Sequence, residues 1–158
     1  MLTLHFENAS GEAGVPDESD VHRWLSYTLN DYPRDFEICV RLVSREESAR
    51  LNSDYRGKTN ATNVLSFPAD LPEEISPLIG DLAICVPVVA EEAKQQHKPL
   101  TAHWAHMLIH GCLHLMGYDH IEPAQASQME QLETRILADL GFPDPYQTET
   151  LFASGQQQ

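Results

Sequence analysis

The sequence predicts one α/β or α+β domain built on a small sheet of about four strands. The chain has 158 residues, an ordinary length for a single domain. Hydrophobic residues make up 42% of it and charged residues 22%, which is typical of a globular protein and excludes collagen-like and disordered chains. Segments of strand pattern alternate with segments of helical pattern, without an internal repeat or a linker. We therefore expect one domain over residues 1–152 and a frayed tail over 153–158.

The first half of the chain is predicted to form two strand–helix units. Residues 2–6 alternate apolar and polar side chains, as a half-buried strand does, and the apolar residues of 21–29 repeat at helical spacing. Residues 36–43 alternate again and predict the second strand. A capping box at 44–47 then begins a helix that is expected to end near Ser53.

Two further strands are expected in the middle of the chain. The run 63–67 stops at Pro68, and the mostly apolar run 79–86 ends at Pro87, which suits the first turn of a helix. The intervening residues 68–77 are rich in proline and acidic residues, which predicts a loop that can move.

The rest of the chain is predicted to be helical. Three segments have helical periodicity, over 88–97, 101–116 and 123–140. Gly117 and Gly141 follow the last two segments at the position of a helix C-cap.

The charge of the chain restricts its partners. The formal net charge of -14 repels polyanions, so contact with a nucleic acid requires a local region of positive charge. Half of the 10 Lys and Arg residues fall in one short segment, as Arg41, Arg45, Arg50, Arg56 and Lys58. This segment indicates either a phosphate-binding surface or a cluster of ordinary solubilising charges.

The cysteines and the N-terminal residues indicate a reducing compartment. Cys39, Cys85 and Cys112 are an odd number of cysteines at wide spacing in apolar runs, which is typical of buried free thiols. No apolar run approaches the roughly 18 residues of a spanning helix, and the first residues lack the features of a signal peptide. We therefore expect a cytoplasmic protein.

Most of the histidines of the chain lie between residues 103 and 120, and three have the spacing of metal ligands. His110 and His114 are one helical turn apart, so both imidazoles can reach one ion. Gly117 can take a positive φ and turn the chain, which lets His120 swing toward the same ion. Core histidines in an ordinary helix would explain one or two of the three but not this spacing. Three imidazoles leave one position of a tetrahedral ion open, as in catalytic zinc sites.

The spacing from His110 to His120 coincides with the zinc-binding frame of the metzincin proteases. That frame places a catalytic Glu directly after its first histidine, where this chain has Gly111. The metal ligands of the frame are therefore present, and its general base is missing.

Four neighbours of the predicted ligands are assigned lesser roles. His103 and His106 lie too far along the helix to share the ion with both His110 and His114, so they are expected to line the groove or to pack locally. Cys112 points away from the metal and is expected in the core. Asp119 could orient an imidazole or serve only as a turn residue.

With these residues the chain resembles the bacterial YbeY family of endoribonucleases. Residues 110–120 fit the family pattern H-G-x-x-H-L-x-G-Y-D-H, and the likeness covers nearly the whole chain. It extends to LN-x-x-YRGK at 51–58, TNVLSFP at 62–68 and GDLAIC at 80–85. Many members carry Asp at the position of Asn63, a departure that does not disturb the resemblance.

The resemblance implies a fold, a cofactor and a substrate. The fold is α+β, with a small mixed sheet and helices, and the cofactor is one Zn²⁺ held by His110, His114 and His120. The activity is a single-strand-specific, metal-dependent endoribonuclease that matures the 3′ end of 16S rRNA and acts in ribosome quality control. The implied partners are single-stranded RNA, above all rRNA, and the ribosome or its proteins, whereas neither DNA nor a membrane is expected.

The resemblance also assigns Arg56 to the active groove. A guanidinium is always charged and can hold a phosphate through paired donors while negative charge develops. Without the resemblance, Arg56 would be interpreted as a surface residue of a turn. Lys58 is expected to extend the positive surface along the RNA.

Several alternatives stay open at the level of sequence. The phosphodiester can be attacked by water or by a ribose 2′-hydroxyl, and no residue is assigned as general acid or base. The competing functions are a ribosome-assembly protein with a structural zinc and a metzincin-like metal-dependent hydrolase.

Overall fold

The computed structural model describes residues 1–119 and 121–146. These residues form four strands and five helices, in the order β1 (Leu2–Asn8), α1 (Glu18–Thr28), β2 (Phe36–Val43), α2 (Arg45–Arg56), β3 (Val64–Pro68), β4 (Leu78–Cys85), α3 (Val86–Gln95), α4 (Leu100–Leu115) and α5 (Pro123–Asp139). The predicted elements and their order are confirmed. The predicted tail 153–158 lies outside the described residues.

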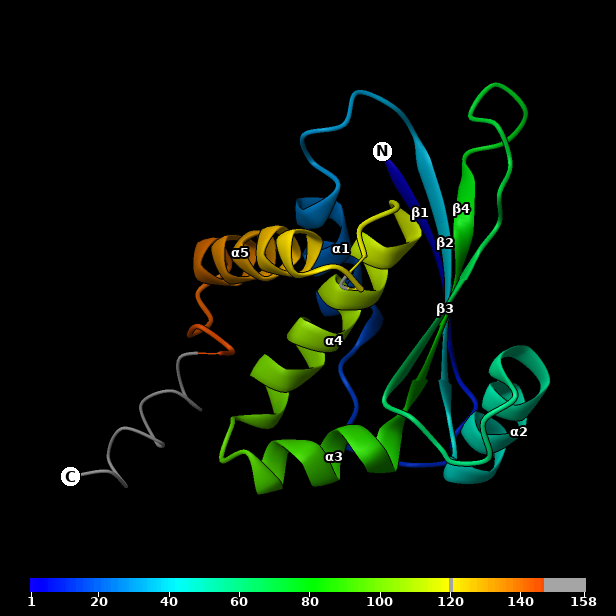
Figure 1. Ribbon diagram of the computed structural model, residues 1–158, viewed down its shortest axis with the longest axis vertical. Coiled ribbons are helices and arrows are strands. Elements are labelled where there is room, and N and C mark those ends of the chain that lie inside the picture. The colour runs from blue at the N-terminus through cyan, green and yellow to red at the C-terminus, as the bar shows by residue number, and fades with distance from the viewer. Residues whose placement is uncertain (120, 147–158) are drawn as a thin grey trace.

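The strands form one mixed sheet in the order β1-β2-β4-β3 (Figure 1). β1, β2 and β4 run parallel to one another, and β3 pairs with β4 in the antiparallel sense. Parallel neighbours require a crossover connection, which α1 provides between β1 and β2. The expected α+β class with a small mixed sheet is thus confirmed.

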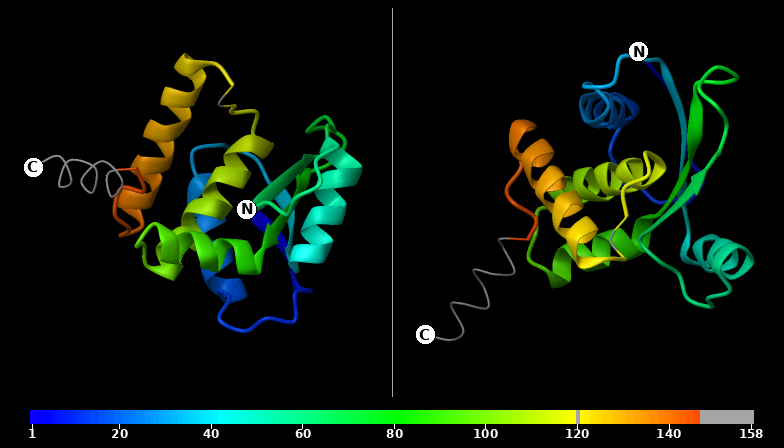
Figure 2. Two further views of the ribbon diagram at one scale, coloured as in Figure 1. Left: turned by 60° about the horizontal axis from the view of Figure 1, so that its bottom comes forward. Right: turned by 45° about the horizontal axis from the view of Figure 1, so that its top comes forward.

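Helices cover the two faces of the sheet unequally (Figures 1 and 2). α1 and α4 pack on one face, α3 and α5 pack against α4, and α2 lies on the opposite face. The alternation of β2 decides which side chains face which layer. Ile38, Val40 and Leu42 enter the main core, whereas Arg41 lies on the α2 side and is bonded to Glu47.

α4 is the central helix of the molecule. Every side chain from His103 to Ile109 is buried, because the sheet, α1, α3 and α5 surround this helix. A helix that is buried on nearly all sides places its polar residues in a rigid apolar surrounding. At 16 residues it is also short, and no helix in the described part of the chain could cross a membrane.

Gly111 brings α4 unusually close to the sheet. A Cβ atom at this position would lie 2.9 Å from Leu82 Cδ2 and 3.1 Å from Val64 Cγ2. The carbonyl oxygen of Gly111 accepts a hydrogen bond of 3.2 Å from Ser66 Oγ on β3. Since carbon atoms in contact prefer about 3.5–4.0 Å, only glycine allows this approach without displacing the sheet side chains.

α2 extends three residues beyond the predicted end near Ser53, so that prediction was too short. Gly57 takes a left-handed φ of 70°, and its N–H bonds to the carbonyl of Ser53 at 3.0 Å. Such a glycine cap satisfies the last carbonyl groups of a helix. Arg56 is consequently the final residue of a helix rather than part of a turn.

Candidate metal site

His110 and His114 bring two ring nitrogens together on one side of α4. Their Nε2 atoms are 3.1 Å apart, and both side chains are half-buried. The structure thus places two of the three predicted ligands next to each other, as expected for residues one helical turn apart.

The loop after α4 fixes the ring of His114. Gly117 has a φ of 98° and turns the chain, so that the carbonyl of Tyr118 lies 3.0 Å from His114 Nδ1. A carbonyl can only accept a hydrogen bond, so Nδ1 carries the proton. The lone pair of the neutral ring is therefore at Nε2.

Glu133 on α5 fixes the ring of His110 in the same way. Its Oε1 lies 2.8 Å from His110 Nδ1, and the glutamate is fully buried. Burial raises the pKa of Glu133, but hydrogen bonds from His106 and His110 outweigh this effect and lower the pKa to about 2. Because an ionised carboxylate only accepts, His110 donates from Nδ1 and carries its lone pair at Nε2.

These two tautomers make the site suitable for a metal ion. Two Nε2 lone pairs face each other at 3.1 Å, an arrangement that is repulsive unless a cation or a proton lies between them. Two imidazoles on one tetrahedral zinc ion place their nitrogens about 3.3 Å apart. A cavity of about 270 Å³ opens beside His110, between Met129, Glu133 and Tyr146. The donor set and the space therefore fit a metal ion.

A second grouping of donor atoms shares His110. His106, His110 and Glu133 each offer a ligand atom, and these atoms lie within 4.8 Å of one another. Both carboxylate oxygens already accept hydrogen bonds, Oε2 from His106 at 2.7 Å and from the hydroxyl of Tyr146 at 2.6 Å. We interpret this grouping as a hydrogen-bonded support for the metal site, since 2.7–2.8 Å is the length of a charge-assisted hydrogen bond.

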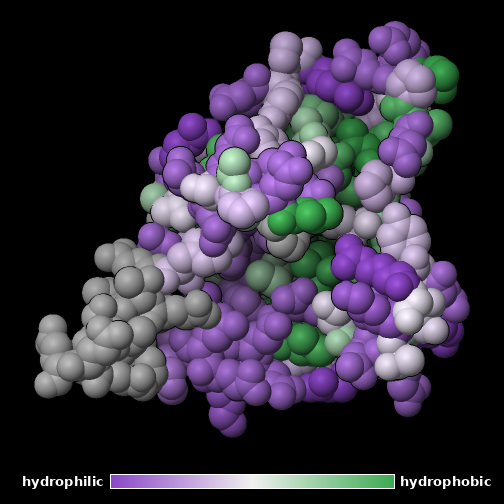
Figure 3. Space-filling view, in the orientation of Figure 1, coloured by the Kyte–Doolittle hydropathy of each residue, from purple (hydrophilic) through white to green (hydrophobic). Residues whose placement is uncertain are grey.

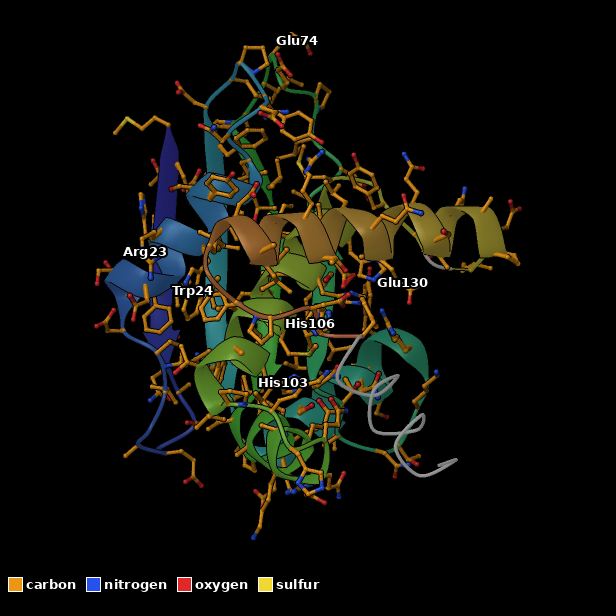
Figure 4. All side chains as sticks on the ribbon, turned by 90° about the vertical axis from the view of Figure 1, so that its left-hand side faces the viewer. Arg23, Trp24, Glu74, His103, His106 and Glu130 are labelled. Atoms are coloured by element: carbon orange, nitrogen blue, oxygen red, sulfur yellow. The ribbon has the colours of Figure 1, made fainter. Side chains whose placement is uncertain are left out.

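The two other α4 histidines pack locally, one of the two alternatives expected for them. Figure 4 shows His103 and His106 following each other along α4, with α5 crossing that helix. His106 is buried, which lowers its pKa although Glu133 opposes the effect, so its ring is neutral. His103 bonds to Glu92 at 2.9 Å, and Glu92 accepts from the side-chain amide of Asn63 at 3.1 Å.

The remaining predicted residues of this region have mixed outcomes. His120 lies outside the described residues, so its role as third ligand stays a prediction. Asp119 is half-buried in the loop before it, and its orienting role likewise stays a prediction. Cys112 is fully buried, and all three cysteines are free thiols.

The positive segment divides into neutralised and available charges. Arg41 pairs with Glu7 and Glu47, and Arg45 pairs with Glu91. The other three cations of the segment are exposed, and their side chains make no hydrogen bond or ion pair within the described residues: Arg50, Arg56 and Lys58. The positive surface is therefore narrower than the sequence suggests.

Arg56 does not touch His110 or His114. It is carried by α2 on one face of the sheet, whereas His110 and His114 are carried by α4 on the other (Figure 1). Both helices contact β3, the outermost strand on that side of the sheet, through Tyr55 of α2 against Phe67 and through the Gly111 carbonyl of α4 bonded to Ser66.

Two residues of the site, Glu133 and Tyr146, were not predicted from the sequence. Glu133 lies four residues after the buried Met129 and four before the buried Leu137, so it occupies the apolar face of α5. A charged residue on such a face is unusual, because a buried acid requires partners. This acid on the apolar face of α5 was the feature of the sequence that could have pointed to a functional role. Tyr146 follows α5 in a segment without periodicity, so no pattern in the sequence pointed to it.

Gly111 also supplies a physical reason against the metzincin-like hydrolase. The glycine faces Leu82 and Val64 of the sheet, so a glutamate at this position would have to occupy the closely packed interface. The position that carries the protease base in that frame is therefore structural in this chain.

Comparison with known proteins agrees with the histidine pattern. The family model described as Endoribonuclease YbeY matches residues 5–141. The Endoribonuclease YbeY of Stutzerimonas stutzeri is 55% identical over 148 residues, which cover 92% of this chain and 92% of that protein. The Endoribonuclease YbeY of Halorhodospira halophila is 52% identical over 150 residues, covering 92% of this chain and 97% of the other.

A solved structure has the same fold. The solution structure of TM1509 from Thermotoga maritima has a TM-score of 0.62 at 27% identity, over 85% of this chain and 87% of that one. Since the family model spans most of the chain and its curated relatives are matched over nearly their full length, the chain belongs to the YbeY family of endoribonucleases.

Proposed function

We propose that this chain is a zinc-dependent endoribonuclease that cuts single-stranded RNA. The proposal assigns one Zn²⁺ to His110, His114 and His120, and the stabilisation of the scissile phosphate to Arg56. The observation that carries it is the pair of Nε2 lone pairs 3.1 Å apart on α4. An endoribonuclease role itself follows from the family.

The chain's own residues prepare this site for chemistry. When bound, zinc supplies a Lewis acid that polarises a phosphoryl oxygen and lowers the pKa of water. Glu133 and the carbonyl of Tyr118 hold the two imidazoles in the tautomers that ligate. Arg56 is permanently charged and unpaired among the described residues, so it can bind a phosphate without first breaking an ion pair.

The exposed end of α2 offers a surface for flexible RNA. Tyr55 is 55% exposed and packs edge-on against Phe67 at a centroid distance of 4.6 Å, which holds its ring in place. It precedes Arg56 directly, and Lys58 follows two residues later. Single-stranded RNA is bound where aromatic rings stack on its bases and neighbouring cations pair with its phosphates.

We further propose a ribosomal substrate and a cytoplasmic location. The family resemblance supports maturation of the 3′ end of 16S rRNA and ribosome quality control, with the ribosome or its proteins as partners. The three free thiols support a reducing compartment such as the cytoplasm. The net charge of -14 supports a small RNA footprint and disfavours binding to DNA duplexes or to anionic membranes.

The direct test compares one RNA sequence as a single strand and as a duplex. We expect the zinc-loaded protein to cut the single strand at least about tenfold faster, because a rigid A-form duplex cannot bend a phosphate toward the metal site. A chelator should abolish cutting, and added zinc should restore it. The ends of the product distinguish attack by water from attack by the 2′-hydroxyl.

Two outcomes would contradict the proposal. Equal cutting of both forms would remove the preference for single strands. Binding of ribosomal RNA without any cutting, with zinc retained, would favour the alternative of a ribosome-assembly protein with a structural metal.

Lys58→Ala should weaken RNA binding in a salt-dependent way. A phosphate contact on a single strand contributes about -0.7 to the slope of log K against log salt, so the slope should flatten by about 0.7. The measurement is a binding titration at several salt concentrations. Lys94→Ala is the matched control, since Lys94 is an exposed lysine on α3 and its loss changes the net charge equally. The same flattening in both variants would show a general charge effect instead.

A further inference from the structure

The contacts of Glu133 form a polar cluster next to the proposed metal ligand His110. Its two carboxylate oxygens accept hydrogen bonds from His110 at 2.8 Å, from His106 at 2.7 Å and from Tyr146 at 2.6 Å. The glutamate has no exposed surface, and its hydrogen bond with His106 is also buried. Since an uncompensated buried charge is costly, these three donors hold the carboxylate in one position.

We propose that Glu133 is a positioning residue of the metal site, which fixes His110 in the Nδ1–H tautomer and aims its Nε2 at the ion. His106 and Tyr146 hold Glu133 in turn. The inference rests on the proposed function in one respect, that His110 is a metal ligand, and it makes no assumption about the RNA.

The geometry separates this role from direct ligation by Glu133. Its oxygen Oε1 faces Nδ1 of His110, on the opposite side of the imidazole ring from Nε2, where His114 approaches. One ion bound at Nε2 of His110 therefore lies across the ring from the carboxylate. Carboxylates that bond to the outer nitrogen of a metal-ligating histidine raise its basicity and fix its orientation.

Glu133→Gln tests the inference while keeping the shape of the side chain. A carboxylate accepts at both ends, but an amide accepts at one end and donates at the other. In the variant, either His106 or His110 therefore faces a donor and is driven to the other tautomer. We expect zinc binding to weaken by about 10–100-fold while the stoichiometry stays at one ion per chain.

The primary measurements are zinc affinity, by competition with a chromophoric chelator, and the His110 tautomer, by long-range ¹⁵N–¹H NMR of the metal-free protein. We expect wild-type His110 to carry its proton on Nδ1 and the variant to show a mixture of tautomers. Glu74→Gln is the control, because it removes one charge from an exposed glutamate in the β3–β4 loop, far from His106 (Figure 4). This control should bind zinc as the wild type does.

Three results would overturn the inference. A wild-type His110 that carries its proton on Nε2, or zinc affinity within twofold of wild type in a variant whose His110 tautomer has changed, would show that Glu133 does not position the ligand. A changed absorption spectrum of the Co²⁺-substituted variant, together with lost stoichiometry, would make Glu133 a ligand itself. If Glu133→Gln fails to fold, Tyr146→Phe removes one of the three donors without changing charge, and the wild-type tautomer alone still decides. None of these measurements uses RNA, so a failure of RNA cleavage is scored separately.

Discussion

His114→Ala should lose bound zinc and RNA cleavage together. The substitution removes one of the two Nε2 donors that face each other on α4, and a site left with two protein ligands binds zinc weakly. We expect affinity to fall about 100-fold or more and cleavage to fall to the level of the chelated wild type. The zinc-dependent rise in thermal stability should vanish, because binding energy of the folded state alone appears as stability.

Metal analysis after dialysis and a thermal melt with and without zinc measure these effects. The metal-free variant should lose only about 1 kcal/mol, the value of one hydrogen bond, here the bond from His114 Nδ1 to the carbonyl of Tyr118. His5→Ala is the control, since His5 is an exposed histidine on the opposite face of the sheet and bonds to Glu37. Full zinc occupancy in His114→Ala would place the ion elsewhere, with the group of His106, His110 and Glu133 as the first alternative.

Arg56→Ala should lose most RNA cleavage while keeping the fold and the zinc. Its side chain is exposed, so removing it empties no part of the core. Removing one donor that stabilises charge in a transition state typically costs 10²–10³-fold in rate, and we expect a loss of about that size. Arg56→Lys should recover only part of the rate, because an ammonium lacks the paired donors of a guanidinium.

Arg50→Ala is the matched control for this experiment. Arg50 is exposed on the same helix, and six residues at about 100° each place it roughly 120° around the helix from Arg56. Single-turnover cleavage at saturating RNA separates the chemical step from binding. Equal losses in both variants would show that α2 acts through its general charge, and near wild-type cleavage by Arg56→Ala would make Arg56 an ordinary surface residue.

Local rules predicted most of the fold. Period-two alternation located β1 and β2, and apolar runs that end at prolines located β3 and β4. Helical spacing with glycine caps located α4 and α5. All these signals depend on residues close in sequence. The end of α2 was placed too early because the last turn of this helix is polar and has no apolar periodicity. The helix ends where Gly57 caps it through backbone bonds to the carbonyls of Asn52 and Ser53. The division of the helices between the two faces of the sheet was not predicted at all, as it depends on contacts far apart in the chain.

The site shows the same limit. The pair His110 and His114 follows from a single helical turn and was predictable. Glu133 reaches His110 across 23 residues of sequence, so nothing local to either residue indicated their hydrogen bond. The pairing of Arg41 with Glu7 and of Arg45 with Glu91 likewise joins separate elements, which is why a count of cations overstated the positive surface.

The close packing at Gly111 has a consequence for how this scaffold can evolve or be redesigned. Introducing a protease-type base there requires Leu82 and Val64 to move aside or to become smaller, since even the Cβ atom of the new side chain would lie within 3.1 Å of both. Each intermediate along that route leaves either a clash or a void between helix and sheet, and such defects typically cost 1–3 kcal/mol or more. Peptide hydrolysis is thus separated from this histidine frame by a barrier of folding stability, although the two frames differ by one residue in their pattern.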